Sequence, residues 1–263
     1  MTTPTDNAAP TVAYSTLGSG PEKVVALHGW MGDEYTYSKL TSVLDVDAFT
    51  YAFPVYRGYG ASRHLVGEYT VEEIARDVLA VADKLNWPRF NIVGHSMGGL
   101  VAQRILLDAS ERVKRIVAVT PVPACGARFD SDTLELFLNG VESDEVCMSI
   151  VNFSTGGRLP RRWVEETARH ARSVVREDAM RGYLRAFNET DISAGVDGNG
   201  VPIKVLVGEH DPAHTVAAMR DTFGTWYPNA RIETINNAGH YPMDEAPLAL
   251  VSAIESYLKE RNP

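Results

Sequence analysis

The stretch NIVGHSMGGLVAQ, residues 91–103, constrains the fold of this 263-residue chain more than any other. A strand-like run ends at Gly94, Ser96 follows two positions later, and Gly98 and Gly99 open a helix-like run. Glycines just inside a helix cost about 1 kcal/mol each against alanine, so their presence indicates a steric requirement. In a tight strand–turn–helix, a side chain at Gly94 or Gly98 would crowd the backbone. The pattern therefore predicts Ser96 at a strand end beside a helix N-terminus, where a backbone N–H and the helix dipole stabilise negative charge.

The rest of the chain alternates short apolar runs with longer amphipathic ones. Several of the short runs are continuously apolar, which is typical of strands buried on both faces of a parallel sheet. A helix is predicted over Val71–Leu85, with Thr70 and Glu73 as a capping box, and further helices over Gly99–Ala109 and Ala249–Leu258. This alternation predicts an α/β fold with a mostly parallel sheet flanked by helices. The predicted strands are Val12–Leu17, Lys23–Leu27, Phe49–Phe53, Phe90–Val93, Arg115–Val119, Ile203–Val207 and Arg231–Ile235.

Residues 125–191 interrupt the alternation, because they carry helical patterns and no convincing strand. A crossover between parallel strands needs only about a dozen residues, so this much longer connection favours an insertion. We therefore predict a helical lid over residues 125–191, inserted into a core domain of residues 1–124 and 192–263. The oligomeric state cannot be predicted from the sequence.

Composition excludes several classes of function. The formal net charge is −9 and no run of lysine or arginine stands out, which argues against nucleic acid or an anionic membrane as the main partner. No stretch approaches the roughly 20 apolar residues that a membrane span needs. The first residues resemble no secretory signal, so we expect a cytoplasmic chain in which Cys125 and Cys147 are free thiols.

Five motifs occur in an order that is informative as a set. Gly94–Gly98 fits G-x-S-x-G, the nucleophile elbow, and His28-Gly29-Trp30 follows the second predicted strand like an oxyanion loop. The other three are RGYGAS at 57–62, GEHD at 208–211 and GHYP at 239–242. Through these motifs the chain resembles the α/β-hydrolase superfamily over residues 12–258, and in particular the esterases, lactonases and C–C hydrolases with a GHSMGG elbow. We accordingly expect the α/β-hydrolase fold, with the helical lid of this chain inserted after the sixth sheet strand.

The resemblance implies a catalytic triad of Ser96, Asp211 and His240, in the chain order of the family. It also implies an oxyanion hole formed by the backbone N–H groups of Trp30 and Met97. It implies neither a metal nor an organic cofactor, and the expected partner is a small-molecule substrate. Predicted substrate-pocket residues are His28, Tyr35, His95 and Trp163, with Trp30 as a further candidate; His28 also suits structural hydrogen bonds beneath the oxyanion loop. Apolar side chains that could serve either the pocket or the lid's own core are Leu134, Leu136, Phe137, Leu138, Val146, Ile150, Phe153 and Trp163.

Three local features bear on this assignment. Some relatives place the triad acid just after the fifth strand, but residues 120–123 read TPVP, which favours Asp211. His210 and His214 are spaced like a metal-binding pair, yet no third ligand is clustered with them in the sequence. Val55 replaces the acid that the family usually has before the R-G turn, so the loop near the pocket could be arranged differently.

The expected function is hydrolysis of a small carboxylic ester, lactone or related acyl compound through an acyl-enzyme, with a medium-sized and largely apolar acyl group. A C–C hydrolase of ring-cleavage products is an alternative with the same triad. A cofactor-free dioxygenase shares the HGW loop but lacks this elbow and uses the acid that is missing after the fifth strand. A lyase or synthase, or a ligand receptor with slow turnover, is also compatible with the fold, because fold alone does not fix function.

Overall fold

A computed structural model describes residues 11–260 of the chain. Its strands form one seven-stranded sheet in the order β1-β3-β2-β4-β5-β6-β7, and only β1 pairs antiparallel with its neighbour. All seven predicted strands are confirmed, with ends that differ by at most two residues. The strands are β1 (Tyr14–Leu17), β2 (Glu22–Leu27), β3 (Phe49–Pro54), β4 (Phe90–His95), β5 (Val113–Val119), β6 (Ile203–Gly208) and β7 (Ala230–Ile235).

The predicted helices outside residues 125–191 are confirmed as well. At the start of α1, the Thr70 hydroxyl accepts the N–H of Glu73, but the Glu73 carboxylate accepts from Tyr69 rather than from Thr70, so the reciprocal half of the capping box is shifted by one residue. The described helices outside this range are α1 (Val71–Lys84), α2 (Met97–Asp108), α7 (Ser193–Val196), α8 (Val216–Asp221), α9 (Phe223–Trp226), α10 (Pro242–Glu245) and α11 (Pro247–Lys259), with 3-10 turns η1 (Ser38–Leu40), η2 (Gly60–Ser62) and η3 (Ser110–Arg112).

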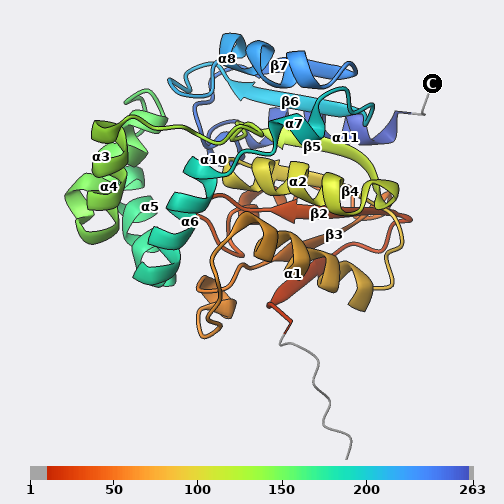
Figure 1. The fold of residues 1–263 in the computed structure, drawn as a ribbon, viewed down its shortest axis with the longest axis horizontal. Helices are drawn as coiled ribbons and strands as arrows, with labels where there is room; N and C mark the ends of the chain where they lie inside the picture. The colour runs from red at the N-terminus through yellow and green to blue at the C-terminus, as the bar shows by residue number, and fades with distance from the viewer. Residues whose placement is uncertain (1–10, 261–263) are drawn as a thin grey trace, which may run out of the picture.

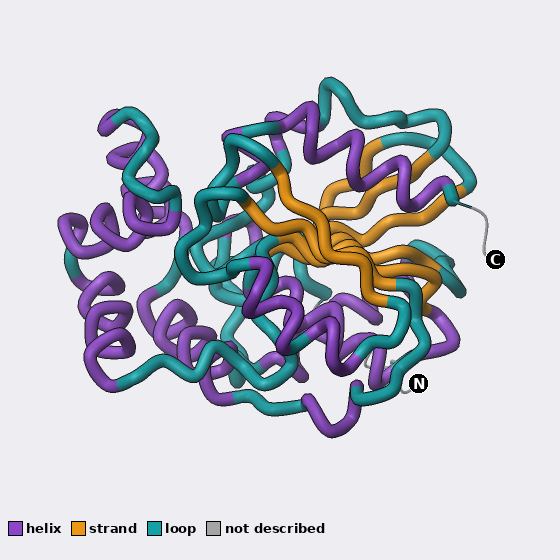
Figure 2. The backbone as a smooth tube through the Cα atoms, turned by 90° about the horizontal axis from the view of Figure 1, so that it is seen from above, coloured by secondary structure: helices purple, strands orange, loops and turns teal. Residues whose placement is uncertain are grey.

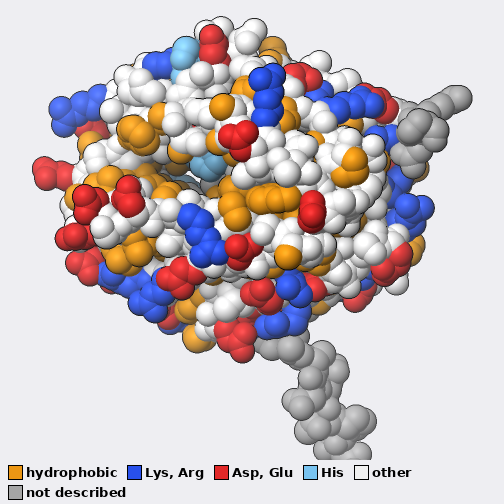
Figure 3. Space-filling model, turned by 45° about the horizontal axis from the view of Figure 1, so that its top comes forward, with side chains coloured by type: hydrophobic (Ala, Val, Ile, Leu, Met, Phe, Trp, Pro, Cys, Tyr) orange, Lys and Arg blue, Asp and Glu red, His pale blue; other side chains and the backbone are white. Residues whose placement is uncertain are grey.

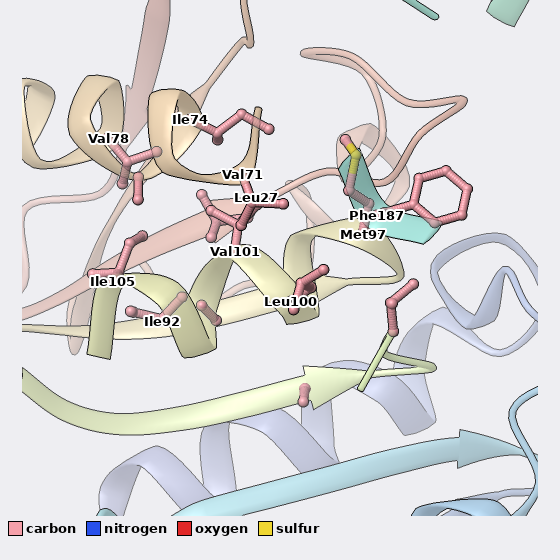
Figure 4. Close-up of a cluster of buried hydrophobic side chains, with 14 of the residues drawn as sticks. Leu27, Val71, Ile74, Val78, Ile92, Met97, Leu100, Val101, Ile105 and Phe187 are labelled. Carbon is pink, nitrogen blue, oxygen red and sulfur yellow. The ribbon is translucent and has the colours of Figure 1, made fainter. Parts of the chain in front are cut away.

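Both faces of the sheet are buried, and this explains the continuously apolar strands. Val25 and Leu27 of β2 belong to a cluster that includes the apolar faces of α1 and α2, part of which Figure 4 shows. Val24 and Ala26, which point to the opposite face, pack in a second cluster with α11. Figure 2 shows the twisted strands with helices on both sides.

Residues 125–191, called here the helical segment, form four helices and no sheet strand, as predicted. These residues connect β5 to β6. In the described chain, five strands of the sheet precede residue 125, so the helical segment follows the fifth strand and not the sixth. Figure 1 shows these helices grouped at one end of the sheet. They are α3 (Ser131–Glu142), α4 (Asp144–Ser154), α5 (Arg161–Val174) and α6 (Glu177–Glu189).

Within residues 11–260, no helix is both long and apolar enough to cross a membrane. Cys125 is half-buried and Cys147 is buried, and both are free thiols, as expected.

Candidate active site

Ser96 occupies the turn between β4 and α2 in a backbone conformation that non-glycine residues rarely adopt, with φ +54° and ψ −118°. Its N–H donates to the carbonyl of Val119 on β5, at 3.0 Å. A Cβ atom at Gly94 would lie 2.3 Å from the carbonyl oxygen of Gly98, and one at Gly98 would lie 2.7 Å from that of Leu27. These short distances explain why the turn requires glycine at positions 94 and 98, as the sequence pattern predicts.

Three predicted residues come together at the carboxyl end of the sheet. Ser96 follows β4, Asp211 follows β6, and His240 lies in the loop between β7 and α10. His240 Nε2 is 3.0 Å from Ser96 Oγ, and His240 Nδ1 is 2.7 Å from Asp211 Oδ2. This geometry places a base within hydrogen-bond reach of a hydroxyl, with a carboxylate orienting the base.

Asp211 is suited to remain ionised although its side chain is only 1% exposed. Oδ1 accepts the backbone N–H groups of Ala213 and His214, each at 3.0 Å. Burial of the carboxyl opposes ionisation, but the charge of His240 and hydrogen bonds from His214 and His240 outweigh it, so the pKa of Asp211 lies well below its usual range. A carboxylate in this state holds the imidazole of His240 with its Nδ1 proton toward Asp211.

The main chain of His240 is fixed from two sides. Its N–H donates to the carbonyl of Ser154 at the end of α4, at 3.0 Å. Its carbonyl accepts from His95 Nε2 at 2.8 Å and from Thr120 Oγ1 at 3.2 Å. Burial, followed by the charge of His240, lowers the pKa of His95 to about 3, so His95 is neutral and donates from Nε2. His95 thus both borders the cavity described below and positions His240.

The loop after β2 lies directly against Ser96. A Cβ atom at Gly29 would be 3.0 Å from Ser96 Cβ, so glycine allows the loop to approach the serine closely without a shift of either. The Gly29 carbonyl accepts from Gly32 N at 3.1 Å and from His28 Nδ1 at 2.9 Å. Because a trans peptide is planar, holding this carbonyl also orients the Trp30 N–H of the same peptide. Met97 begins α2, so its N–H is among those that find no partner within the helix.

His28 does not line the cavity, which corrects its prediction as a pocket residue. The ring is buried and stacks on Tyr56 with centroids 3.8 Å apart, and its Nε2 accepts from Tyr56 N at 3.3 Å. Burial lowers the pKa of His28 to about 4, so the ring is neutral with its proton on Nδ1. His28 instead has its alternative predicted role, because it makes structural hydrogen bonds beneath the loop after β2.

A cavity of about 630 Å³ opens beside Ser96, His240 and Asp211, which all line it. Figure 3 shows a hollow in which histidine side chains are visible between hydrophobic ones. One wall is a closed circuit of ring contacts, in which neighbouring ring centroids lie 4.5–5.9 Å apart. The indole N–H of Trp30 donates to the Met180 carbonyl at 2.7 Å, so this wall presents apolar faces. The four rings, called here the aromatic wall, belong to Trp30, Phe129, Phe137 and Phe187.

The other predicted pocket residues divide into two groups. Tyr35, His95 and Trp163 line the cavity, and so do Phe137, Ile150 and Phe153. Leu134 and Leu138 pack instead against the core cluster beneath α1 and α2, and Leu136 is 44% exposed. Phe129 and Phe187 are pocket residues that the sequence did not predict, because their positions beside Trp30 depend on how α3 and α6 dock.

The cavity also has polar residues that link the helical segment to the core. His170 on α5 lies 2.7 Å from the buried Asp33 carboxylate, and its ring meets the edge of Tyr35. The hydrogen bond with Asp33 raises the pKa of His170. Burial disfavours the charge of Asp33, but the hydrogen bonds from His170 and from the Tyr35 N–H, together with the charge of His170, outweigh it, so the pKa of Asp33 is lowered. A second polar contact on the cavity lies within the core itself, where Lys39 and Asp244 form an ion pair at 2.5 Å.

The two histidines of the GEHD loop have separate surroundings. His210 points its Nε2 toward Glu209 at 3.5 Å, and it does not line the cavity. His214 instead turns its Nδ1 toward Asp211 Oδ2, at 3.2 Å, and its ring centroid lies 4.8 Å from that of His240. The side chains that face His214 are therefore Asp211 and His240, and His210 is not one of them.

The departure at Val55 has a local compensation. Val55 is buried in the apolar core, and Arg57 finds its acid on α1, where both oxygens of Asp77 accept from the guanidinium at 2.7 and 2.8 Å. The turn after β3 is thus anchored to α1 without an acid at position 55.

Comparisons with known proteins agree with this architecture. A family model described as "alpha/beta hydrolase fold" matches residues 23–247. The chain is 26% identical to a pimeloyl-[acyl-carrier protein] methyl ester esterase of Nitrosomonas europaea, over 93% of this chain and 98% of that protein. It is 24% identical to 3-oxoadipate enol-lactonase 2 of Acinetobacter baylyi, over 78% and 77% respectively. The solved structure of an esterase from Exiguobacterium antarcticum superposes with a TM-score of 0.82 at 18% identity, covering 95% of this chain and 96% of that one.

Proposed function

Because the chain belongs to the α/β-hydrolase fold family, we propose that it is a serine hydrolase that cleaves a small carboxylic ester or lactone through an acyl-enzyme. The observation that carries the proposal is the continuous contact from Ser96 Oγ through the His240 ring to Asp211 Oδ2, at 3.0 and 2.7 Å, on the wall of the cavity. The triad roles of these residues are part of the proposal.

In the first step, His240 Nε2 accepts the Ser96 hydroxyl proton while Oγ attacks the carbonyl carbon of the substrate. Asp211 stabilises the imidazolium that forms, without itself taking the proton. His240 then donates this proton to the alkoxide leaving group, and the acyl group remains on Ser96. In the second step, His240 removes a proton from water, which attacks the acyl-enzyme and releases the carboxylic acid.

The negative charge on the substrate oxygen in each tetrahedral intermediate is assigned to the N–H groups of Trp30 and Met97. The Met97 N–H lies at the start of α2, where the helix dipole favours an anion. The Trp30 N–H is oriented in advance by the two hydrogen bonds to the Gly29 carbonyl. Losing one such donor costs about 2.7–4 kcal/mol of transition-state stabilisation in serine hydrolases.

The substrate class is inferred from the relatives and from the cavity. The two relatives compared above are named as an ester hydrolase and a lactone hydrolase. A cavity of about 630 Å³ with an aromatic wall suits a medium-sized, largely apolar acyl group. The helical segment contributes Phe129, Phe137 and Phe187 to that wall, which supports its role as a lid.

The arrangement around His240 disfavours the dioxygenase alternative. Thr120 stands just after β5, where an acid would be needed, and its hydroxyl donates to the main-chain carbonyl of His240 rather than to the ring. The acid that contacts the ring is Asp211.

The test is a panel of esters and lactones whose acyl groups increase in size, assayed with the wild type and with Ser96→Ala. Removal of the nucleophile is expected to lower turnover on the order of 10⁶-fold. The variant should keep its melting temperature, since Ser96 contributes little buried surface. Near-wild-type turnover by Ser96→Ala on a good substrate would overturn the mechanism.

A further inference from the structure

One histidine beside the proposed triad has no part in the mechanism. His214 lies three residues after Asp211 at the start of the loop that leads to α8, and it lines the same cavity. Its Nδ1 is 3.2 Å from Asp211 Oδ2, the oxygen that also contacts His240 Nδ1 at 2.7 Å. Asp211, His214 and His240 thus form a cluster. Within residues 11–260, they are the one group of at least three His, Cys, Asp or Glu side chains whose possible metal-ligand atoms all lie within 4.8 Å of one another.

We propose that Asp211, His214 and His240 form a binding site for a zinc ion, and that zinc at this site switches the hydrolase off. The binding is independent of the proposed function, whereas the inhibition rests on it. Two imidazole nitrogens and one carboxylate oxygen are a ligand set that Zn²⁺ prefers, with water as the fourth ligand.

Two of the three ligand separations already approach those of a zinc site, and the third is at most 4.8 Å. Zinc–nitrogen distances of about 2.0–2.1 Å place the ligand atoms of a tetrahedral site roughly 3.3 Å apart. Two of the three separations, 2.7 and 3.2 Å, are already close to that value. The Nδ1 atoms of His214 and His240 both face Oδ2 of Asp211, and the centroids of the two rings lie 4.8 Å apart.

The site is open to an ion from one side and buried on the other. The side chains of His214 and His240 are 18% and 12% exposed, and Asp211 is 1% exposed beneath them. The ionised Asp211 supplies negative charge, and its second oxygen is held by the N–H groups of Ala213 and His214. The fourth position would face the cavity, where water or the carboxylate of a product can bind.

Zinc at this position would remove the base. In the resting site, His240 carries its proton on Nδ1, facing Asp211, and presents a lone pair from Nε2 to Ser96. When zinc binds Nδ1, the neutral ring carries its single proton on Nε2 instead. The ring then donates to Ser96 Oγ and cannot accept its proton, so the hydroxyl is no longer activated.

The experiment uses Ser96→Ala, which keeps all three ligands and makes the binding measurement independent of turnover. Titration with Zn²⁺ against a chromophoric chelator is expected to show one ion per chain. Adding His214→Ala should weaken binding at least about tenfold. Adding His210→Ala, four residues earlier and outside the cluster, should not change it. If His214→Ala proves unstable, the ¹⁵N shifts of the His240 ring in Ser96→Ala report the same event, because zinc must move the proton from Nδ1 to Nε2.

The matching activity measurement compares each protein with its own zinc-free rate. The wild type and His210→Ala should be inhibited and then restored by EDTA, whereas His214→Ala should resist the same zinc concentration. No stoichiometric binding, or binding that His214→Ala leaves unchanged, would overturn the site. If zinc binds as expected but Ser96→Ala retains the wild-type turnover, the site stands and the proposed function fails.

Discussion

The sheet-bearing core and the helical segment both line the cavity, but they shape it by different means. The core places Ser96 through backbone constraints, including a positive φ angle and glycines that allow contacts closer than any side chain permits. The helical segment contributes side chains from helices whose own buried cluster is small, comprising Cys147, Val151, Val164 and Ala168. Under the proposed function, the core would determine whether bond cleavage occurs, and the segment would determine which acyl group is accepted.

After removal of Ser96 itself, the largest effect is expected for the acid of the core. Asp211→Asn removes the charge that stabilises the imidazolium and favours the wrong tautomer of His240. Turnover should fall about 10⁴-fold, as in other Ser-His-Asp enzymes. Glu209→Gln, two residues earlier on the same loop and exposed, should stay within about twofold of the wild type. Steady-state kinetics on one ester would measure both variants, and equal losses would contradict the role of Asp211.

A smaller loss, in stability as well as activity, is expected for Gly94→Ala. The added Cβ atom would lie 2.3 Å from the Gly98 carbonyl, so the elbow must shift. Overpacking of this kind costs about 1–3 kcal/mol, which corresponds to a melting temperature lower by about 2–10 °C. Gly200→Ala, where the new atom meets nothing closer than 4.0 Å, is the control. Equal melting temperatures for the two variants would show that the elbow tolerates a side chain.

In the helical segment, Phe137→Ala should change selectivity rather than catalysis. Removing a ring from the aromatic wall is expected to lower kcat/KM for bulky apolar acyl groups about 10–100-fold. For acetyl esters the change should be within about threefold. Leu136→Ala, on the same helix but exposed, is the matched control. A uniform loss across the whole panel would instead indicate that Phe137 supports the structure of the core site.

The smallest effect concerns the contact between His170 and Asp33. The pKa of His170 is raised, so its contribution to stability is complete below about pH 6.5 and is lost as the pH rises through the folded-state pKa. The pKa of Asp33 is lowered, so its contribution is present above its ordinary pKa and fades only in acid. His170→Ala should therefore lower the melting temperature by about 1–2 °C at pH 6.

The difference in melting temperature between the wild type and His170→Ala should vanish in alkaline solution. Melting curves between pH 5 and pH 9, with the exposed His64→Ala as a control for the loss of a histidine, would measure it. A difference that grows as the pH rises would contradict the assignment.

The sequence allowed good predictions where the determinants are local. The strands, the elbow at Gly94–Gly98 and the order of Ser96, Asp211 and His240 depend on neighbouring residues and on motifs. His28 was placed in the pocket because its motif adjoins the elbow, but its ring turns beneath the loop to stack on Tyr56. The partners of Arg57 and Phe187 lie far along the chain, and no pattern in the sequence specifies such contacts.

His214 illustrates the same limit at the site itself. In the sequence its neighbour is His210, which suggests a pair that the fold does not form. In space its neighbours are Asp211 and His240, 26 residues further along the chain. The division into core and lid domains, which depends on how the helical segment behaves in solution, stays a prediction.

The central claim is that the core activates Ser96, and covalent labelling tests it most directly. The folded protein would be treated with a fluorophosphonate and analysed by intact-protein and peptide mass spectrometry, beside Ser96→Ala. We expect one adduct per chain, located on Ser96 and absent from the variant. An unlabelled wild type, or an adduct that persists in Ser96→Ala, would contradict this expectation.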